Sequence, residues 1–152
     1  MIRIDFTLEL ADEAATEALG ARIAGALRVG DAVLLSGPLG AGKTALARAV
    51  LRAAGVTGHV PSPTFTLVQH YETEGLTIRH FDLYRIERQI DLGELGLEDA
   101  LENGAVLVEW PERAGGPWPE NALRIALDPK DEHLRIAHIQ GEEYWRVLKE
   151  TA

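Results

Sequence analysis

The sequence contains no cysteine and no long apolar run. Without cysteine, the chain of 152 residues can form neither a disulfide framework nor a thiolate zinc site. No stretch approaches the roughly 18 apolar residues that a membrane-spanning helix requires. The first ten residues alternate in polarity like a strand and lack the apolar core of a signal peptide. We therefore expect a soluble, cytoplasmic protein that does not engage a membrane.

Basic residues are outnumbered by acidic ones. The chain carries 15 Lys and Arg against 24 Asp and Glu, a formal net charge of −9. A surface of this sign does not attract nucleic acid over long range, so we expect any contact with RNA to be local or to pass through a partner. Internal repeats and low-complexity segments are also missing from the sequence. The length fits a single domain, residues 1–152.

The N-terminal third shows regular apolar periods. Residues 2–10 alternate with a period of two, which predicts a strand with one buried face. Apolar residues then recur every fourth position over 15–27, which predicts a helix with Asp12 as its N-cap. Gly30 follows this helix and is a residue that can end it.

Two short segments, 32–35 and 105–108, are entirely apolar. Such runs are typical of strands that are buried on both faces of a parallel sheet. Between them, residues 43–54 are rich in Ala, Leu and Arg and predict a helix. We therefore expect an α/β fold of the P-loop NTPase type, with a mixed, mainly parallel sheet flanked by helices.

The middle of the chain is less regular. Residues 65–71 and 76–81 are predicted strands joined by a turn. Residues 83–103 are interpreted as one or two helices broken at Gly93 and Gly96.

The C-terminal part is predicted to form a β-hairpin and a short helix. Alternation over 123–127 and 134–136 predicts two strands with a turn at 128–131. Glycines and prolines over 115–119 mark a loop before them, and residues 141–149 are suited to a final short helix.

The segment from Gly37 to Thr44, GPLGAGKT, matches the phosphate-binding pattern G-x-x-x-x-G-K-[ST] without a substitution. Its glycines let successive backbone N–H groups face phosphate oxygens, and the following helix adds its positive N-terminal end. Lys43 would reach the β- and γ-phosphates, and the Thr44 hydroxyl would bind Mg²⁺. A strand before the loop and a helix after it argue against a chance glycine-rich turn, so ATP with Mg²⁺ is the expected ligand. The expected loop contacts are Gly37, Leu39, Gly40, Ala41, Gly42, Lys43 and Thr44.

Two acids follow predicted strands. Glu109 comes directly after the apolar run 105–108, and ligands of open α/β sheets collect at the carboxyl ends of strands. We expect Glu109 to hold Mg²⁺, the alternative being an ordinary strand-end carboxylate. Asp82 ends the predicted strand 76–81 and could orient water, bind the metal or simply cap a helix. Histidine His80 lies near these acids, and we interpret it as a structural histidine.

Three blocks beyond the phosphate loop carry a family resemblance. They are SPTFTLV at 62–68, HFDLYR at 80–85 and VEWP at 108–111. In this order and spacing they resemble the TsaE family of bacterial tRNA-modification ATPases, over about residues 12–112.

The resemblance implies a role in making N6-threonylcarbamoyladenosine at position 37 of tRNAs that read codons beginning with A. In that pathway a TsaB–TsaD complex transfers the threonylcarbamoyl group. A TsaE protein joins the complex, and its ATP hydrolysis, which is weak without the partners, resets the complex between turnovers. Contact with tRNA is then only indirect, through the complex.

The resemblance also assigns roles to residues. Lys43, Asp82 and Glu109 take catalytic roles, with Asp82 and Glu109 joining Thr44 at the metal. Thr64 and Thr66 would contact phosphate or metal-bound water from a switch-like segment, the alternative being a rigid proline turn.

Two further assignments lie outside the catalytic group. Thr16, on the first helix, would approach the adenine. Trp110 either packs near the site, faces a partner or fills the core.

Rival functions are a small-molecule kinase, a GTPase and a nucleotide-dependent binding module. A kinase would need a lid with arginines, for which Arg113 is the candidate. A GTPase is disfavoured because neither N-K-x-D nor D-x-x-G follows the phosphate loop. The binding module differs from an ATPase only in its rate of turnover.

Overall fold

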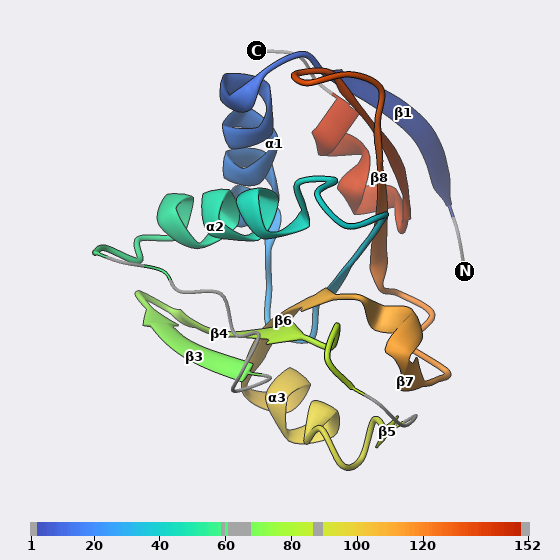
Figure 1. Cartoon of the computed structure of the whole chain (residues 1–152). Coiled ribbons are helices and arrows are strands. Elements are labelled where there is room, and N and C mark those ends of the chain that lie inside the picture. The colour runs from blue at the N-terminus through green and yellow to red at the C-terminus, as the bar shows by residue number, and fades with distance from the viewer. Residues whose placement is uncertain (1–2, 59, 61–67, 87–89, 150–152) are drawn as a thin grey trace.

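A computed structural model describes residues 3–58, 60, 68–86 and 90–149 (Figure 1). The strands are β1 (Ile4–Leu10), β2 (Ala32–Ser36), β3 (Val68–Thr73), β4 (Leu76–Asp82), β5 (Ile90–Asp91), β6 (Gly104–Glu109), β7 (Ala114–Gly115), β8 (Leu123–Pro129) and β9 (Arg135–Gly141). The helices are α1 (Glu13–Ala26), α2 (Lys43–Ala53) and α3 (Leu97–Asn103), with the 3-10 helices η1 (Pro111–Arg113) and η2 (Glu143–Lys149).

Seven of these strands form one mixed sheet in the order β1-β9-β8-β2-β6-β4-β3. The four central strands β8, β2, β6 and β4 are parallel, whereas β9, β1 and β3 pair antiparallel at the two sides. The α/β class with a mixed sheet and a parallel centre is confirmed. The C-terminal hairpin is not an appendage, because its first strand β8 pairs directly with β2.

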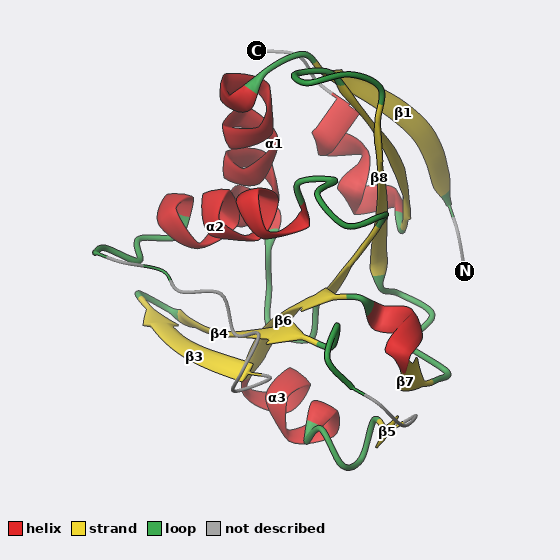
Figure 2. Ribbon diagram, in the orientation of Figure 1, coloured by secondary structure: helices red, strands yellow, loops and turns green. Residues whose placement is uncertain are grey.

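Helices cover the sheet on both faces, as Figure 2 shows. Helices α1 and α2, with η2, lie on one face over a core that includes Leu19, Ile23, Leu46 and Trp145. Helix α3 packs on the opposite face against a smaller cluster. Strands β2 and β6 are buried along almost their whole length, which confirms the interpretation of the two apolar runs.

The first helix begins as expected but ends earlier. Asp12 accepts a hydrogen bond from the backbone N–H of Ala15 at 2.9 Å, as an N-cap does. The helix ends at Ala26, four residues before Gly30. Gly30, with φ of 94°, instead lies in the turn before β2, where its N–H donates to the carbonyl of Gly104 at 2.9 Å.

Helix was predicted over 83–103, and in the described parts of this range, 83–86 and 90–103, it is present only after Gly96. Residues Leu83–Ile86 form a turn closed by the N–H of Ile86 and the carbonyl of Leu83, and β5 pairs with β7 in a separate small sheet. The only helix that the described residues form here is α3, whose N-cap is Gly96. The helical pattern gave a wrong prediction here because turn hydrogen bonds fix the backbone just after β4.

The hairpin turn lies later than predicted. Strand β8 continues to Pro129, and Asp131 closes the turn by accepting from the N–H groups of His133 and Leu134 at 2.8 and 2.7 Å. The predicted final helix is the 3-10 helix η2. In the part of the chain that the structure describes, no helix is long and apolar enough to cross a membrane.

Candidate functional site

The phosphate loop joins β2 to α2 in the arrangement that the sequence pattern predicts. Gly37 has φ of 139°, and a Cβ there would collide with the carbonyl oxygen of Leu127 on β8. Gly42, with φ of 99°, is the N-cap of α2. Both positions therefore require glycine, the first for close approach to a neighbouring strand and the second for a left-handed backbone that starts a helix.

Lys43 turns back over its own loop. Its ammonium donates to the carbonyls of Gly37 and Pro38 at 2.7 and 2.9 Å and lies 4.1 Å from the ring centroid of Trp110. The residue is only 5 % exposed. Burial lowers the pKa of Lys43, whereas the nearby carboxylate of Glu109 acts in the opposite direction.

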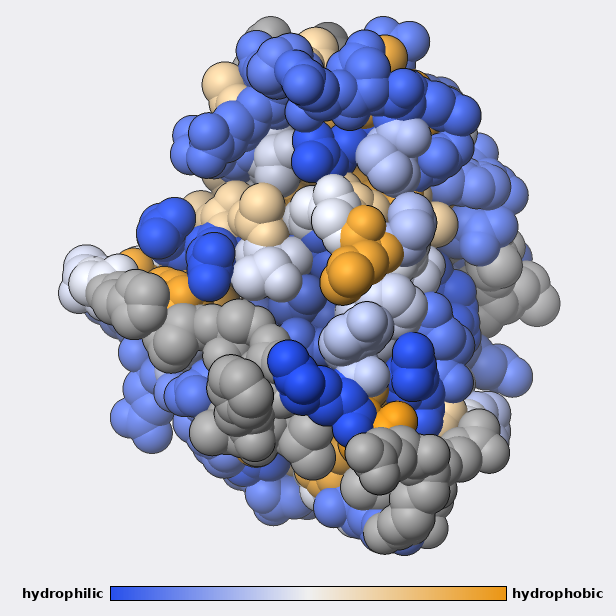
Figure 3. Space-filling model, viewed as in Figure 1, coloured by the Kyte–Doolittle hydropathy of each residue, from blue (hydrophilic) through white to orange (hydrophobic). Residues whose placement is uncertain are grey.

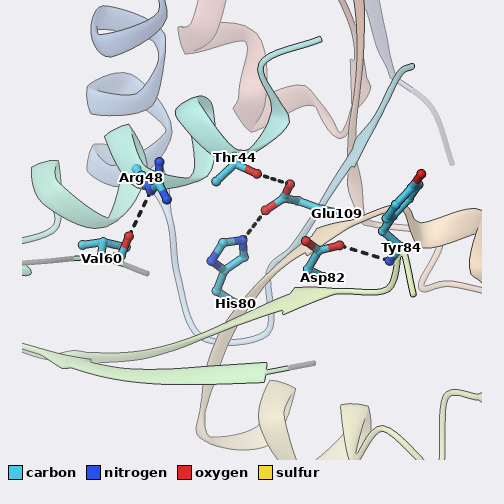
Figure 4. A network of polar contacts seen from close by, with 7 residues as sticks. All are labelled: Thr44, Arg48, Val60, His80, Asp82, Tyr84 and Glu109. Carbon is cyan, nitrogen blue, oxygen red and sulfur yellow. Dashed lines mark hydrogen bonds and ion pairs between the residues drawn. The ribbon is translucent and has the colours of Figure 1, made fainter. Parts of the chain in front are cut away.

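Glu109 joins two elements at the end of the central strands, as Figure 4 shows. Its Oε1 accepts a hydrogen bond from the Thr44 hydroxyl of α2 at 2.6 Å. Its Oε2 lies 2.6 Å from Nε2 of His80 on β4. Glu109 is 2 % exposed and His80 is fully buried. The strand-end acid therefore meets the helix hydroxyl that was predicted to share its metal.

Asp82 stands beside Glu109 because β4 and β6 are parallel and pair these two residues in register. Asp82 is 5 % exposed, and its Oδ1 accepts from the backbone N–H of Tyr84 at 3.0 Å. The carboxylate thus caps a turn, and the helix-cap alternative is wrong because no helix follows among residues 83–86. The remaining surface of this carboxylate faces a pocket.

A pocket of about 530 Å³ gathers these groups. The tip of the phosphate loop forms one side, where Leu39 is 72 % exposed. Asp82 and Glu109 lie in its wall with the basic side chains of Lys43 and Arg85, so charges of both signs are present. Its lining consists of residues 39–45, Asp82, Tyr84, Arg85, Glu109 and Trp110.

Trp110 forms an aromatic wall next to the acid. Its backbone is left-handed, with φ of 59° and ψ of 50°, which is strained for a bulky residue. The ring packs at 4.9 Å from the ring of Tyr84, and the Arg113 guanidinium lies 5.6 Å from it. Trp110 lines the pocket and is also partly buried against the smaller core cluster, so both packing near the site and core packing are observed.

Three of the predicted nucleotide contacts lie elsewhere or outside the described residues. Thr16 on α1 does not line the main pocket but two adjoining ones of about 410 and 270 Å³. Ala45 lines all three pockets, so they meet near the N-terminal end of α2, and the pocket of about 410 Å³ continues along this helix to Ala53. Thr64 and Thr66, with the whole predicted switch-like segment, lie outside the described residues.

Comparison with known proteins places this geometry in a family. The family model described as threonylcarbamoyl adenosine biosynthesis protein TsaE matches residues 10–137. The chain belongs to the TsaE family. The match includes the phosphate loop, Asp82 and Glu109, and it extends beyond the region over which the sequence motifs suggested the resemblance.

Several TsaE relatives are similar over most of their length. The tRNA threonylcarbamoyladenosine biosynthesis protein TsaE of Rickettsia felis is 38% identical over 133 residues, which cover 87% of this chain and 78% of the relative. The protein of the same name from Streptomyces coelicolor is 40% identical over 113 residues, covering 72% and 76%. The crystal structure of YdiB from Bacillus subtilis superposes with a TM-score of 0.75 at 26% identity, covering 98% of this chain and 93% of that one.

The oxygen donors of this TsaE-family site suit Mg²⁺ bound together with a nucleotide. Thr44 and Glu109 present hard oxygen ligands 2.6 Å apart. Within the described residues no group of three or more His, Asp or Glu side chains could by itself hold a metal. Mg²⁺ commonly uses one or two protein oxygens together with phosphates and water, so this incomplete donor set fits it.

The sequence placed His80 near the two acids but did not predict its contact with Glu109. His80 shares a strand face with Asp82, two residues away, and that spacing fits its position. One residue of the site was missed by sequence reasoning. Arg135 on β9 carries no such signal. Its Nε donates to the carbonyl of Ala41 at 2.7 Å, and its guanidinium fills the space beside Gly42. A strand 94 residues away thus supports the phosphate loop.

Proposed function

We propose that this chain is a Mg²⁺-dependent ATPase that serves tRNA threonylcarbamoyladenosine biosynthesis as an accessory motor of a TsaB–TsaD complex. The observation that carries the ATPase part is the contact between Thr44 of the phosphate loop and Glu109 at the end of β6. This contact supports the proposal because a P-loop metal site uses a loop hydroxyl together with a strand-end acid. The family's description and its relatives' names support the pathway.

Lys43 is the residue that would bind the β- and γ-phosphates. Its ammonium already lies inside the loop, where two backbone carbonyls accept its hydrogen bonds. Phosphate oxygens carry more negative charge than carbonyls and would replace them as acceptors. The N-terminal end of α2, capped by Gly42, adds backbone N–H groups that face the same region.

Thr44 and Glu109 would hold Mg²⁺, Thr44 through its hydroxyl and Glu109 through a carboxylate oxygen or a bound water. The ion would neutralise charge that develops on the phosphates during transfer. Asp82 is paired in register with Glu109 and reaches the same pocket, so it is suited to orient water or to join the metal ligands. We assign Asp82, Glu109 and Lys43 to catalysis.

The base of the nucleotide would lie toward α1. Thr16 lines the two pockets that adjoin the phosphate site, and Ala45 links all three. Thr64 and Thr66 remain proposed phosphate or water contacts from the resemblance alone. The whole chain, 1–152, is proposed to act as one P-loop ATPase domain in the cytoplasm.

The proposed partner is a protein complex, with tRNA contacted only through it. The net charge of −9 does not favour direct attraction to RNA. In Figure 3 this face is mostly hydrophilic, with only separate apolar groups. The mouth of the phosphate pocket carries an exposed Leu39, which a protein partner could cover.

The test is ATP hydrolysis by the purified chain, alone and with added TsaB–TsaD complex. We expect slow hydrolysis alone and strong stimulation by the complex, both requiring Mg²⁺. Lys43→Ala should weaken ATP binding by at least about tenfold, because a charge-assisted contact worth about 1.5–3 kcal/mol is lost. ATP binding without stimulation by the complex would contradict the partner, and binding without turnover in any condition would favour a nucleotide-dependent binding module.

A further inference from the structure

We propose that His80 is a positioning residue that orients the Glu109 carboxylate toward Thr44 and the magnesium. The inference rests on the proposed function and adds a residue to it that the phosphate-loop pattern does not include. His80 touches neither nucleotide nor metal in this scheme. Its role is to hold one oxygen of Glu109 so that the other oxygen keeps a fixed direction.

The geometry assigns one partner to each oxygen of the carboxylate. Oε1 accepts from the Thr44 hydroxyl and Oε2 contacts Nε2 of His80, both at 2.6 Å. The two partners come from different elements, α2 and β4, and lie on opposite sides of the carboxylate in Figure 4. Such a pair of contacts removes the free rotation of the carboxylate about its last bond.

The direction of the hydrogen bond follows from the chemistry of the acceptor. An ionised carboxylate has only acceptor oxygens, so Nε2 of His80 carries the hydrogen and donates it. Replacement of His80 by an apolar residue would leave Oε2 without its donor inside the protein. The carboxylate would then turn toward another donor or admit water, and its orientation toward Thr44 would be lost.

The surroundings of His80 argue against a purely structural histidine. The side chain is fully buried, and Nδ1 has no hydrogen-bond partner among the described residues. A buried histidine kept for stability is expected to satisfy both ring nitrogens. Among the described residues, the ring of His80 makes its hydrogen bond to Glu109, so the polar group that this side chain provides is directed at that acid.

The matched control is His138 on β9. Its Nε2 also contacts a carboxylate, Oδ1 of Asp5 at 2.7 Å, so the chemical pairing is the same. His138 is half exposed and its acid is not part of the phosphate pocket. A His138→Leu variant therefore removes a histidine–carboxylate contact without touching the proposed metal site.

The experiment measures how Mg²⁺ changes nucleotide affinity. Calorimetric titrations with a non-hydrolysable ATP analogue are made with Mg²⁺ at a series of concentrations and again with excess EDTA. The variants are His80→Leu, His80→Gln and His80→Asn, with His138→Leu as control. The Gln amide nitrogen can occupy the place of Nε2, whereas the Asn amide nitrogen corresponds to Nδ1. Thermal unfolding of each variant is recorded in parallel.

We expect His80→Leu to raise the Mg²⁺ concentration needed for tight nucleotide binding about 10- to 100-fold, the usual loss when a metal ligand loses its orienting partner. Affinity in EDTA should stay within about twofold of the wild type, because the phosphate contacts of the loop are unchanged. His80→Gln should need nearly as little Mg²⁺ for tight nucleotide binding as the wild type, whereas His80→Asn should behave like His80→Leu.

Several results would overturn the proposal. One is an unchanged Mg²⁺ dependence in the Leu and Asn variants with only a lower melting temperature, which would make His80 structural. Should His80→Leu fail to fold, equal behaviour of the Gln and Asn variants would have the same meaning. Wild-type protein that binds nucleotide equally with and without Mg²⁺ would overturn the proposed function itself, and this result is distinct from a failure of His80 alone.

Discussion

Two buried acids at opposite ends of neighbouring strands differ in what they hold together. Asp31, just before β2, is 4 % exposed, and Glu109, at the end of β6, is 2 % exposed. Asp31 accepts from the backbone N–H of Arg28 at 2.7 Å and from the hydroxyl of Tyr144. Glu109 contacts Thr44 and His80 instead.

The comparison shows that burial of a carboxylate does not by itself indicate function. The partners of Asp31 tie the turn after α1 to the C-terminal η2, and the Arg28 guanidinium stacks 4.0 Å from the ring of Tyr144. This arrangement closes the fold at the amino ends of the parallel strands. Glu109 lies at the carboxyl ends, where such sheets bind ligands, and in the wall of the phosphate pocket.

The sharpest test of the comparison is Glu109→Gln. Loss of the charge that is proposed to hold Mg²⁺ should lower kcat/KM for ATP by more than about 100-fold, since transition-state stabilisation by a metal is worth several kcal/mol. The measurement is complex-stimulated ATP hydrolysis, with the melting temperature as the check on folding. Turnover that stays within about threefold of the wild type would show that Glu109, like Asp31, has only a structural role.

Asp82→Ala should come next in size. If Asp82 orients water as proposed, its removal should lower turnover by about 100-fold, while ATP binding remains mostly intact. Single-turnover hydrolysis and calorimetric binding separate the two effects. Full hydrolytic activity would assign Asp82 a structural role, to which its hydrogen bond with the N–H of Tyr84 contributes.

Asp31→Asn should show the opposite profile. Loss of charge weakens both hydrogen bonds, and one donor meets an amide NH₂, so we expect a lower free energy of unfolding by about 3 kcal/mol. Nucleotide affinity should not change, because Asp31 lies at the other end of the sheet. Denaturant unfolding and calorimetry measure the two quantities. A fall in Mg²⁺-ATP affinity without a loss of stability would break the distinction between the two acids.

Tyr144→Phe should have the smallest effect, a loss of about 1.5 kcal/mol in the free energy of unfolding. It should also change how this free energy depends on pH. Burial, together with the hydrogen bond to Asp31, raises the pKa of Tyr144 from 10.0 to about 12. Between pH 10 and about pH 12 the folded state therefore keeps the Tyr144 proton while the unfolded state loses it. The contribution of Tyr144 to the free energy of unfolding is thus complete below pH 10 and is lost as the pH rises to about 12. The free energy of unfolding, measured with denaturant across this pH range, should fall less steeply in the Phe variant than in the wild type.

The parts of the fold that were predicted correctly are those in which the local sequence pattern and the burial of the residues agree. The strand β2, the phosphate loop and α2 were predicted nearly to the residue because an apolar strand, a fixed glycine pattern and a helix follow each other directly. Residues 83–86 and 90–96 were predicted wrongly as helix, because turn hydrogen bonds override a weak helical pattern. Sequence reasoning placed Asp82 and Glu109 at strand ends, and the parallel register of β4 and β6 brings them side by side.

The sequence by itself determined the phosphate-binding loop and the two acids, because glycine conformation, helix start and strand end are local properties of the chain. Only the tertiary structure decided their partners. His80 meets Glu109, Arg135 supports Ala41, and Tyr144 meets Asp31 across separations of 29, 94 and 113 residues. Contacts of this kind depend on strand order and helix packing, and the periodicity of the sequence reports only which face of an element a side chain occupies.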